Sequence, residues 1–172
     1  FQLLSKKPDF VGVIGISPEA SVIYKKLKWN YGQLSHYYLT TNVNIGLNDY
    51  QLVNQELNYV CSSSLNENEI SSKDDFLPKK DFWYYRKRFI NHPVFDYVFF
   101  KIVEHELIFI GRIVHYNDLK VFHVVDVIGE LHNIRLKGYI STFLFDESID
   151  LFEMMYYDSR TVEIDLEIKK DD

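Results

Sequence analysis

The sequence has little cysteine and no excess of positive charge. Cys61 is the one cysteine among 172 residues, which excludes an internal disulfide and a metal site made of four thiolates. A single thiol is compatible with a reducing compartment, so we expect a cytoplasmic location. Acidic residues outnumber basic ones, 25 to 19, for a formal net charge of −6. Binding to nucleic acid through a basic surface is therefore not expected.

Long apolar runs are also absent. No segment approaches the roughly 20 apolar residues that a membrane-spanning helix needs, and we expect no membrane span. Apolar residues are nevertheless plentiful, at 47% of the chain, and aromatic residues make up 16%. This composition is enough for a folded core of one large domain, or of one domain with part of another.

The opening stretch predicts a strand, a helix and a second strand. An apolar run at 11–16 is typical of a strand that is covered on both faces. Ser17 can cap a helix whose first residue is Pro18, and a second strand is expected at 32–39. A strand covered on both faces needs neighbours, and the chain starts at Phe1, so we expect further sequence before it. The helix has one apolar stripe, formed by Ala20, Ile23, Tyr24 and Leu27.

The rest of the chain divides into a polar segment and a second folding unit. Residues 46–79 are polar with little periodicity, and we expect a linker or exposed loop. Residues 80–172 predict a helix that Asp81 caps and Pro93 ends, and then an antiparallel meander. The meander strands are expected at 95–103, 107–116 and 120–128, followed by a helix at 131–145 and strands at 149–157 and 161–168. This order predicts an α+β fold, or a mixed-sheet α/β fold.

The run at 16–29, Ile-Ser-Pro-Glu-Ala-Ser-Val-Ile-Tyr-Lys-Lys-Leu-Lys-Trp, resembles the C-terminal motif of the GCN5-related N-acetyltransferases (GNAT). In that motif a helix carries a tyrosine and ends on a glycine and an aromatic residue. Tyr24, Lys28 and Trp29 take these positions. Residues 83–129 look like the front half of the same fold, an antiparallel meander flanked by helices. The resemblance implies a tandem protein, with residues 1–45 ending a first GNAT-like unit and 80–172 forming a second, incomplete one.

The resemblance also implies a function. The patterns Gly-Gln-Leu-x-His-Tyr-Tyr and Arg-Phe-x-Asn-His-Pro look like those of tandem proteins of bacterial surface-polysaccharide biosynthesis. We therefore expect an acyl-CoA-dependent N-acyltransferase, or a part of one. Its acyl donor would be acetyl-CoA or another acyl-CoA, and its acceptor an amino sugar or nucleotide sugar. The alternative is a non-catalytic GNAT-like module that binds a partner or a substrate.

The implied cofactor and catalytic positions follow from the same alignment. The tyrosine of the motif, Tyr24, would protonate the departing thiolate of CoA. The loop that holds the pyrophosphate would lie at Ile128, Gly129 and Glu130. Gly129 would allow close backbone approach, but Glu130 places a negative charge beside the phosphates, which motivates the non-catalytic alternative.

Charged and polar residues on the meander are further candidates. Asp126 is a lone charge in an apolar strand, so it needs a partner or acts as a general base. His123 and His115 lie on facing strands and could pair, relay protons or bind a metal. Each has a structural alternative, namely an ion pair or an ordinary hydrogen bond, and we predict no metal site. Two clusters of polar and aromatic residues, at 36–38 and 88–93, could stack on a sugar ring or a base, or pack at an interface. The basic triplet at 86–88 could bind an anionic substrate, or form a solvated face of its helix.

Overall fold

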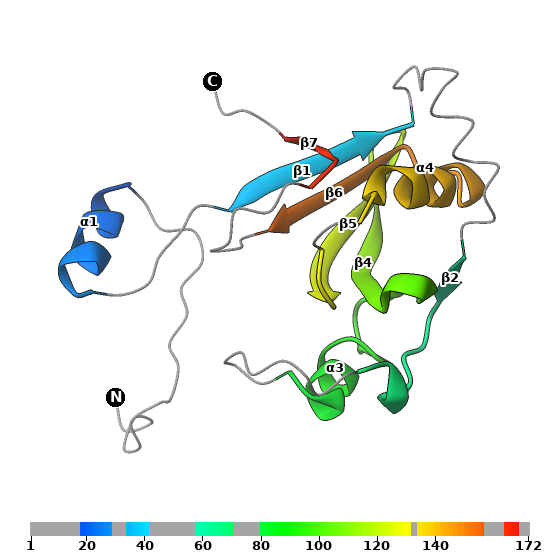
Figure 1. The fold of residues 1–172 in the computed structure, drawn as a ribbon, viewed down its shortest axis with the longest axis horizontal. Helices are drawn as coiled ribbons and strands as arrows, with labels where there is room; N and C mark the ends of the chain where they lie inside the picture. Colours follow the sequence, from blue (N-terminus) through cyan, green and yellow to red (C-terminus); the bar gives the residue numbers. More distant parts are fainter. Residues whose placement is uncertain are drawn as a thin grey trace.

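The computed structural model describes residues 18–28, 34–41, 58–70, 80–131, 134–156 and 164–168. These residues form a seven-stranded sheet in the order β2-β3-β4-β5-β6-β1-β7 (Figure 1). The predicted α+β class is confirmed. The strands are β1 (Ser35–Thr40), β2 (Tyr59–Ser62), β3 (Val98–Ile102), β4 (Leu107–Tyr116), β5 (Leu119–Ile128), β6 (Leu151–Tyr156) and β7 (Glu167–Ile168); the α-helices are α1 (Pro18–Lys26), α3 (Phe82–Arg88) and α4 (Leu136–Asp146), and the short 3-10 helices are η2 (Glu67–Glu69) and η3 (Val103–His105).

The meander is confirmed, since β3, β4 and β5 pair antiparallel in sequence order. Its turns use left-handed backbone at Glu106 and Asn117, with φ of 49° and 54°. The predicted cap of α3 is also confirmed, because Asp81 Oδ1 accepts a hydrogen bond from the Tyr84 amide at 2.8 Å. The predicted strand at 11–16 lies outside the described residues.

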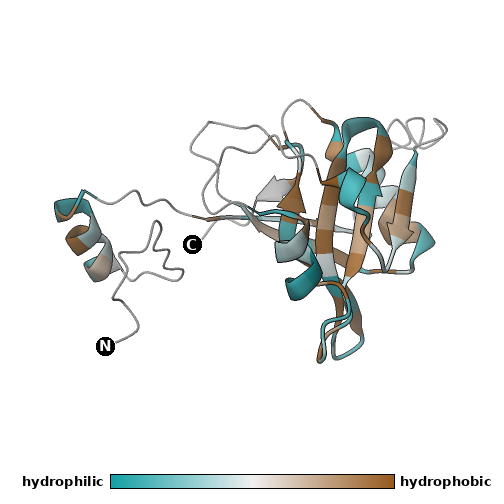
Figure 2. Cartoon of the chain, turned by 90° about the horizontal axis from the view of Figure 1, so that it is seen from below, coloured by the Kyte–Doolittle hydropathy of each residue, from teal (hydrophilic) through white to brown (hydrophobic). Residues whose placement is uncertain are grey.

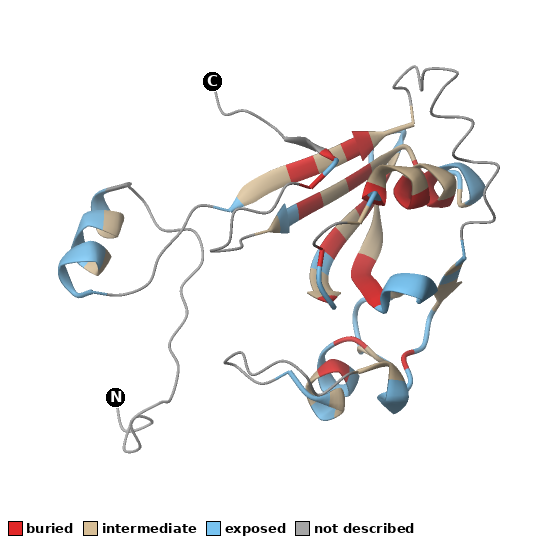
Figure 3. Ribbon diagram, in the orientation of Figure 1, coloured by how far each residue is buried: buried red, intermediate tan, exposed pale blue. Residues whose placement is uncertain are grey.

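The sheet separates two apolar clusters, because successive side chains of a strand point to opposite faces. On one face α4 covers a cluster that contains Phe109, Phe122 and Phe143, all fully buried. On the other face α3 covers a smaller cluster, which includes Tyr85 and Phe99. The hydropathy of the strands alternates accordingly (Figure 2), and many of the buried residues lie on the strands and on α4 (Figure 3).

Strands from all three predicted segments enter this one sheet. β1, from the opening stretch, pairs with β6 on one side and with β7 on the other, antiparallel to both. β2, from the segment expected to be a linker, pairs with β3 at the opposite edge. Helix α1 forms as predicted but lies apart from the sheet (Figure 1), and its Val22, Ile23 and Leu27 are more than half exposed.

β5 and β6 run parallel and separate part-way along their length. They pair at four positions, from Val121 opposite Leu151 to Val124 opposite Met154. At that point the pairing of β5 with β4 shifts register, so that Val125 is an extra, bulged residue. Beyond the bulge β5 continues to its end and diverges from β6 (Figure 1).

Candidate functional site

A row of polar side chains crosses the sheet on the face that α3 covers. Phe122 and Phe152 point to the α4 side, so the residues that follow them, His123 and Glu153, point to the α3 side. The sheet register places His123 beside Arg112 of β4 and beside Glu153 of β6. These residues come from three neighbouring strands, and we refer to Arg112, His123 and Glu153 as the polar row.

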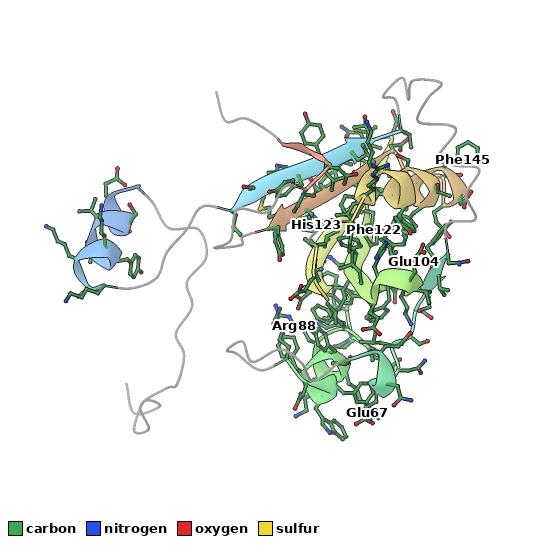
Figure 4. The ribbon with its side chains drawn as sticks, viewed as in Figure 1. Glu67, Arg88, Glu104, Phe122, His123 and Phe145 are labelled. Atoms are coloured by element: carbon green, nitrogen blue, oxygen red, sulfur yellow. The ribbon has the colours of Figure 1, made fainter. Side chains whose placement is uncertain are left out.

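The carboxylate of Glu153 contacts two histidines. Its Oε1 lies 2.6 Å from Nδ1 of His123, and its Oε2 lies 3.5 Å from Nε2 of His36 on β1. A carboxylate only accepts hydrogen bonds, so Nδ1 of His123 is the donor, and Nε2 of the neutral ring is left as an acceptor. The His123 side chain is 35% exposed, so a ligand can reach it (Figure 4). Glu153 and His123 together form an acceptor site suited to an amine or a hydroxyl group.

The structure gives Asp126 a structural partner. Nζ of Lys80 lies 2.6 Å from its Oδ1, and the same oxygen accepts a hydrogen bond from the Val127 amide. An ion pair of this kind stabilises a carboxylate that is only 10% exposed. The geometry therefore favours the structural alternative for Asp126, while its role as a general base stays a prediction.

A pocket of about 770 Å³ opens between α3 and β4, beside the polar row. The guanidinium group of Arg112 lies in this pocket over the ring of Phe95, at 4.4 Å from the ring centre. His92 stacks on the same ring, and its Nδ1 accepts hydrogen bonds from the amides of Val94 and Phe95. We call this the cationic pocket; it is lined by Tyr84, Lys87, Arg88, Phe89, His92, Phe95, Tyr97, Arg112 and Val125.

In the predicted cofactor loop, two residues have a role in packing, and the third carries a negative charge that is unfavourable for binding a phosphate. Ile128 is buried in the cluster under α3. Gly129 has a φ of +100°, and a Cβ there would come within 2.7 Å of the Glu106 carbonyl oxygen, so packing already accounts for the glycine. Glu130 is exposed and lines a second cavity, of about 680 Å³, in which Lys101 is already paired with Glu69 at 2.6 Å.

The N-terminus of α4 is closed by a carboxylate of this chain. The helix begins at Leu136, not at the predicted residue 131; Leu131 is a buried core residue. Oδ1 of Asp165 accepts hydrogen bonds from the amides of Leu136 at 2.8 Å and Lys137 at 3.3 Å. These amides are the groups that would face the pyrophosphate of CoA in the arrangement that the resemblance implies. With Glu130 in the same loop, this segment does not fit a pyrophosphate group.

The remaining predicted residues are not brought together. His115 pairs in register with Lys120, and His123 pairs with Arg112, so the two histidines do not lie opposite each other. Tyr24 lies on α1, away from the polar row (Figure 1). Within the described ranges, no three His, Cys, Asp or Glu side chains are grouped to hold a metal ion, and no helix has the length and apolar character needed to cross a bilayer.

Sequence reasoning missed Arg112, Glu153 and Asp165. Arg112 and Glu153 are each the one charge in an apolar strand segment, Phe-Ile-Gly-Arg-Ile-Val and Leu-Phe-Glu-Met-Met. The argument that selected Asp126 applies equally to both.

No known family, curated protein or solved structure matches the chain.

Proposed function

We propose that this chain is a binding module of acyltransferase-like architecture, which takes a small molecule on the α3 face and does not bind acyl-CoA at α4. The observation that carries the proposal is the Asp165 carboxylate on the first amides of α4. Anion binding at a helix N-terminus requires amides that have no other partner. Here a negative group of the chain itself takes that place.

The α3 face supports a ligand with a hydrogen-bond donor. Glu153 and His123 offer acceptor atoms on the α3 face of the sheet, and Arg112 connects them to the cationic pocket. An amino group would donate to Glu153 or to Nε2 of His123. The amino sugar or nucleotide sugar of a surface-polysaccharide precursor, which the resemblance implies, has a group of this kind.

Acyl transfer to an amine is the second candidate, and the His123–Glu153 pair favours it. A histidine oriented by a carboxylate is a common general base, and Nε2 of His123 would take the proton of an attacking amine. The separation of β5 from β6 beyond Val124 leaves the backbone of β5 next to this pair without a β6 partner among the described residues. The poor fit of the α4 loop to a CoA pyrophosphate places this candidate second.

Two measurements on the whole chain test the proposal. The first is acetyl transfer from acetyl-CoA to glucosamine or glucosamine 6-phosphate, which we expect to be absent. The second is calorimetric titration with acetyl-CoA, in which Asp165→Ala, by removing the carboxylate from the start of α4, should raise the affinity at least tenfold. Asp118→Ala, in the exposed β4–β5 turn, is the matched control and should leave the affinity unchanged.

Two results would contradict the proposal. Equal acetyl-CoA affinities of the wild type and Asp165→Ala would show that the carboxylate does not block the helix terminus. Acetyl transfer by the wild type that His123→Gln abolishes would establish the acyltransferase instead.

A further inference from the structure

We infer that the cationic pocket binds a phosphate or diphosphate group, so that the ligand of the α3 face is a phosphorylated small molecule. This inference rests on the proposed function and names the class of its ligand. The pocket gathers Lys87, Arg88, Arg112 and His92, and none of the described residues that line it is acidic. In a chain with a net charge of −6, such a local excess of cations favours an anionic ligand.

Arg112 provides the most specific observation. Its Nε is buried and has no hydrogen-bond partner within the described part of the chain. A buried donor that lacks a partner is unfavourable, and an anionic oxygen would supply the missing acceptor. The guanidinium group is already held against Phe95, at 4.4 Å from the ring centre, so little side-chain freedom remains to be lost on binding. A guanidinium fork in this position matches the oxygens of a phosphate.

His92 adds a donor of defined orientation. Its Nδ1 accepts hydrogen bonds from the amides of Val94 and Phe95 at 3.2 and 3.1 Å, so the proton of the neutral ring lies on Nε2. The ring is fixed further by its stacking on Phe95. A phosphate oxygen in the pocket could therefore accept a hydrogen bond from Nε2 without any change of tautomer.

The other cations of the pocket are available to a ligand. Among the described residues Lys87, Arg88 and Arg112 form no ion pair with an acidic side chain. Arg88, the last residue of α3 (Figure 4), instead lies near the rings of Tyr84 and Phe89. An incoming anion would not have to displace a carboxylate of the chain.

The bulge joins the pocket to the polar row. Val125, the extra residue of β5, lines the pocket, and Arg112 belongs both to the pocket and to the row. A ligand with its phosphate at Arg112 and its amino group toward Glu153 would occupy both. The pocket volume of about 770 Å³ suits a sugar phosphate or a nucleotide rather than inorganic phosphate alone.

The experiment compares ligands that differ in the phosphate only. The whole chain is titrated by calorimetry with inorganic pyrophosphate, glucosamine 6-phosphate and glucosamine. We expect saturable binding of the two phosphorylated compounds, and affinity for glucosamine at least tenfold weaker than for its phosphate. Arg88→Gln and Arg112→Gln should each weaken binding of the phosphorylated compounds at least tenfold.

Arg86→Gln is the matched control, because Arg86 lies on the same helix but over the Trp83 ring, outside the pocket. It should change the affinity less than twofold. Arg88 is exposed, so its variant keeps the test valid if Arg112→Gln disturbs the sheet.

The outcomes separate this inference from the proposed function. The inference would be overturned if Arg86→Gln and Arg88→Gln changed the affinity for the phosphorylated compounds equally, or if neither compound bound. Either result would leave the proposed function standing. Binding of both phosphorylated compounds that depends on Arg88, together with acetyl transfer by the wild type, would support the phosphate pocket and overturn the proposed function.

Discussion

Gly111 shows how a single residue shapes the α4 face of the sheet. A Cβ at this position would lie 2.5 Å from Cζ of Phe122, whose ring is fully buried. Gly111→Ala therefore forces the ring to move in a tightly packed cluster, and we expect the free energy of unfolding to fall by about 1–3 kcal/mol. The urea midpoint measures this loss.

A double-mutant cycle provides the control for Gly111→Ala. If the Phe122 ring causes the loss, Gly111→Ala should lower the free energy of unfolding by clearly less in a Phe122→Leu background, where the side chain is smaller. An equal loss in both backgrounds would show that the backbone, and not the ring, resists the change.

Single charges in apolar strands were the most informative residues of the sequence. The cost of burying a charge predicts that such a residue has a partner, and it selected Asp126 correctly as a residue that needs one. The identity of the partners was not predictable. Lys80 reaches Asp126 from 46 residues away, and Glu153 reaches His123 from 30 residues away, so only the folded structure reveals them.

At the scale of the element, α3 and α4 explain why local signals predicted one helix start and not the other. The cap of α3 is Asp81, which directly precedes the helix, and the sequence shows it. The residue at the N-cap of α4 is Arg135, which makes no capping hydrogen bond, and the cap comes instead from Asp165, 29 residues from Leu136. The resemblance placed the cofactor loop before this helix, and no local signal in the sequence indicated that Asp165 caps it.

We expect two residues of β2 to make the stability of the fold depend on alkaline pH. Burial, and the charge of Glu147, raise the pKa of the Cys61 thiol from 9.0 to about 11. Burial, and then the hydrogen bond to Asp146, raise the pKa of the Tyr59 hydroxyl well above its usual value. The folded state holds these protons more tightly than the unfolded state does. The stabilising contribution of the thiol is therefore complete below pH 9 and is lost as the pH rises through 11.

Urea midpoints measured from about pH 8 to about pH 11 test this expectation. The midpoint should fall over this range, and that of Cys61→Ser, which has no thiol to ionise, should fall less steeply in the upper part of it. Wild-type and Cys61→Ser profiles that stay parallel over the whole range would contradict a raised pKa of the Cys61 thiol in the folded state.

At the scale of the whole molecule, the sheet order places β1, a strand of the opening stretch, in the same sheet as the later meander. The sequence predicted most strands and their antiparallel order, because hydrophobic alternation is local. It did not predict that β1 would lie between β6 and β7, since strand pairing over such a long stretch of chain leaves no local signal. The division into units at residues 45 and 79 was drawn from composition, and composition does not report pairing.

Leu39 of β1 distinguishes a shared core from two independent units. Its side chain is 2% exposed and belongs to the cluster under α4, together with Phe109 and Phe122 of the meander. Leu39→Ala should therefore lower the free energy of unfolding by about 2–5 kcal/mol. If β1 and β4 belong to one cooperative unit, Leu39→Ala should also make the β4 amides, Leu107–Tyr116, exchange faster with solvent hydrogen. The free energy of opening for these amides should fall by the same amount as the free energy of unfolding.

Leu27→Ala on α1 is the matched control, because Leu27 is 57% exposed and its loss should change the unfolding free energy by less than about 0.5 kcal/mol. If residues 80–172 instead fold as a unit of their own, Leu39→Ala would leave the exchange of the β4 amides unchanged while the β1 amides alone exchange faster. The two results separate a sheet completed by the opening strand from a second unit against which that strand merely docks.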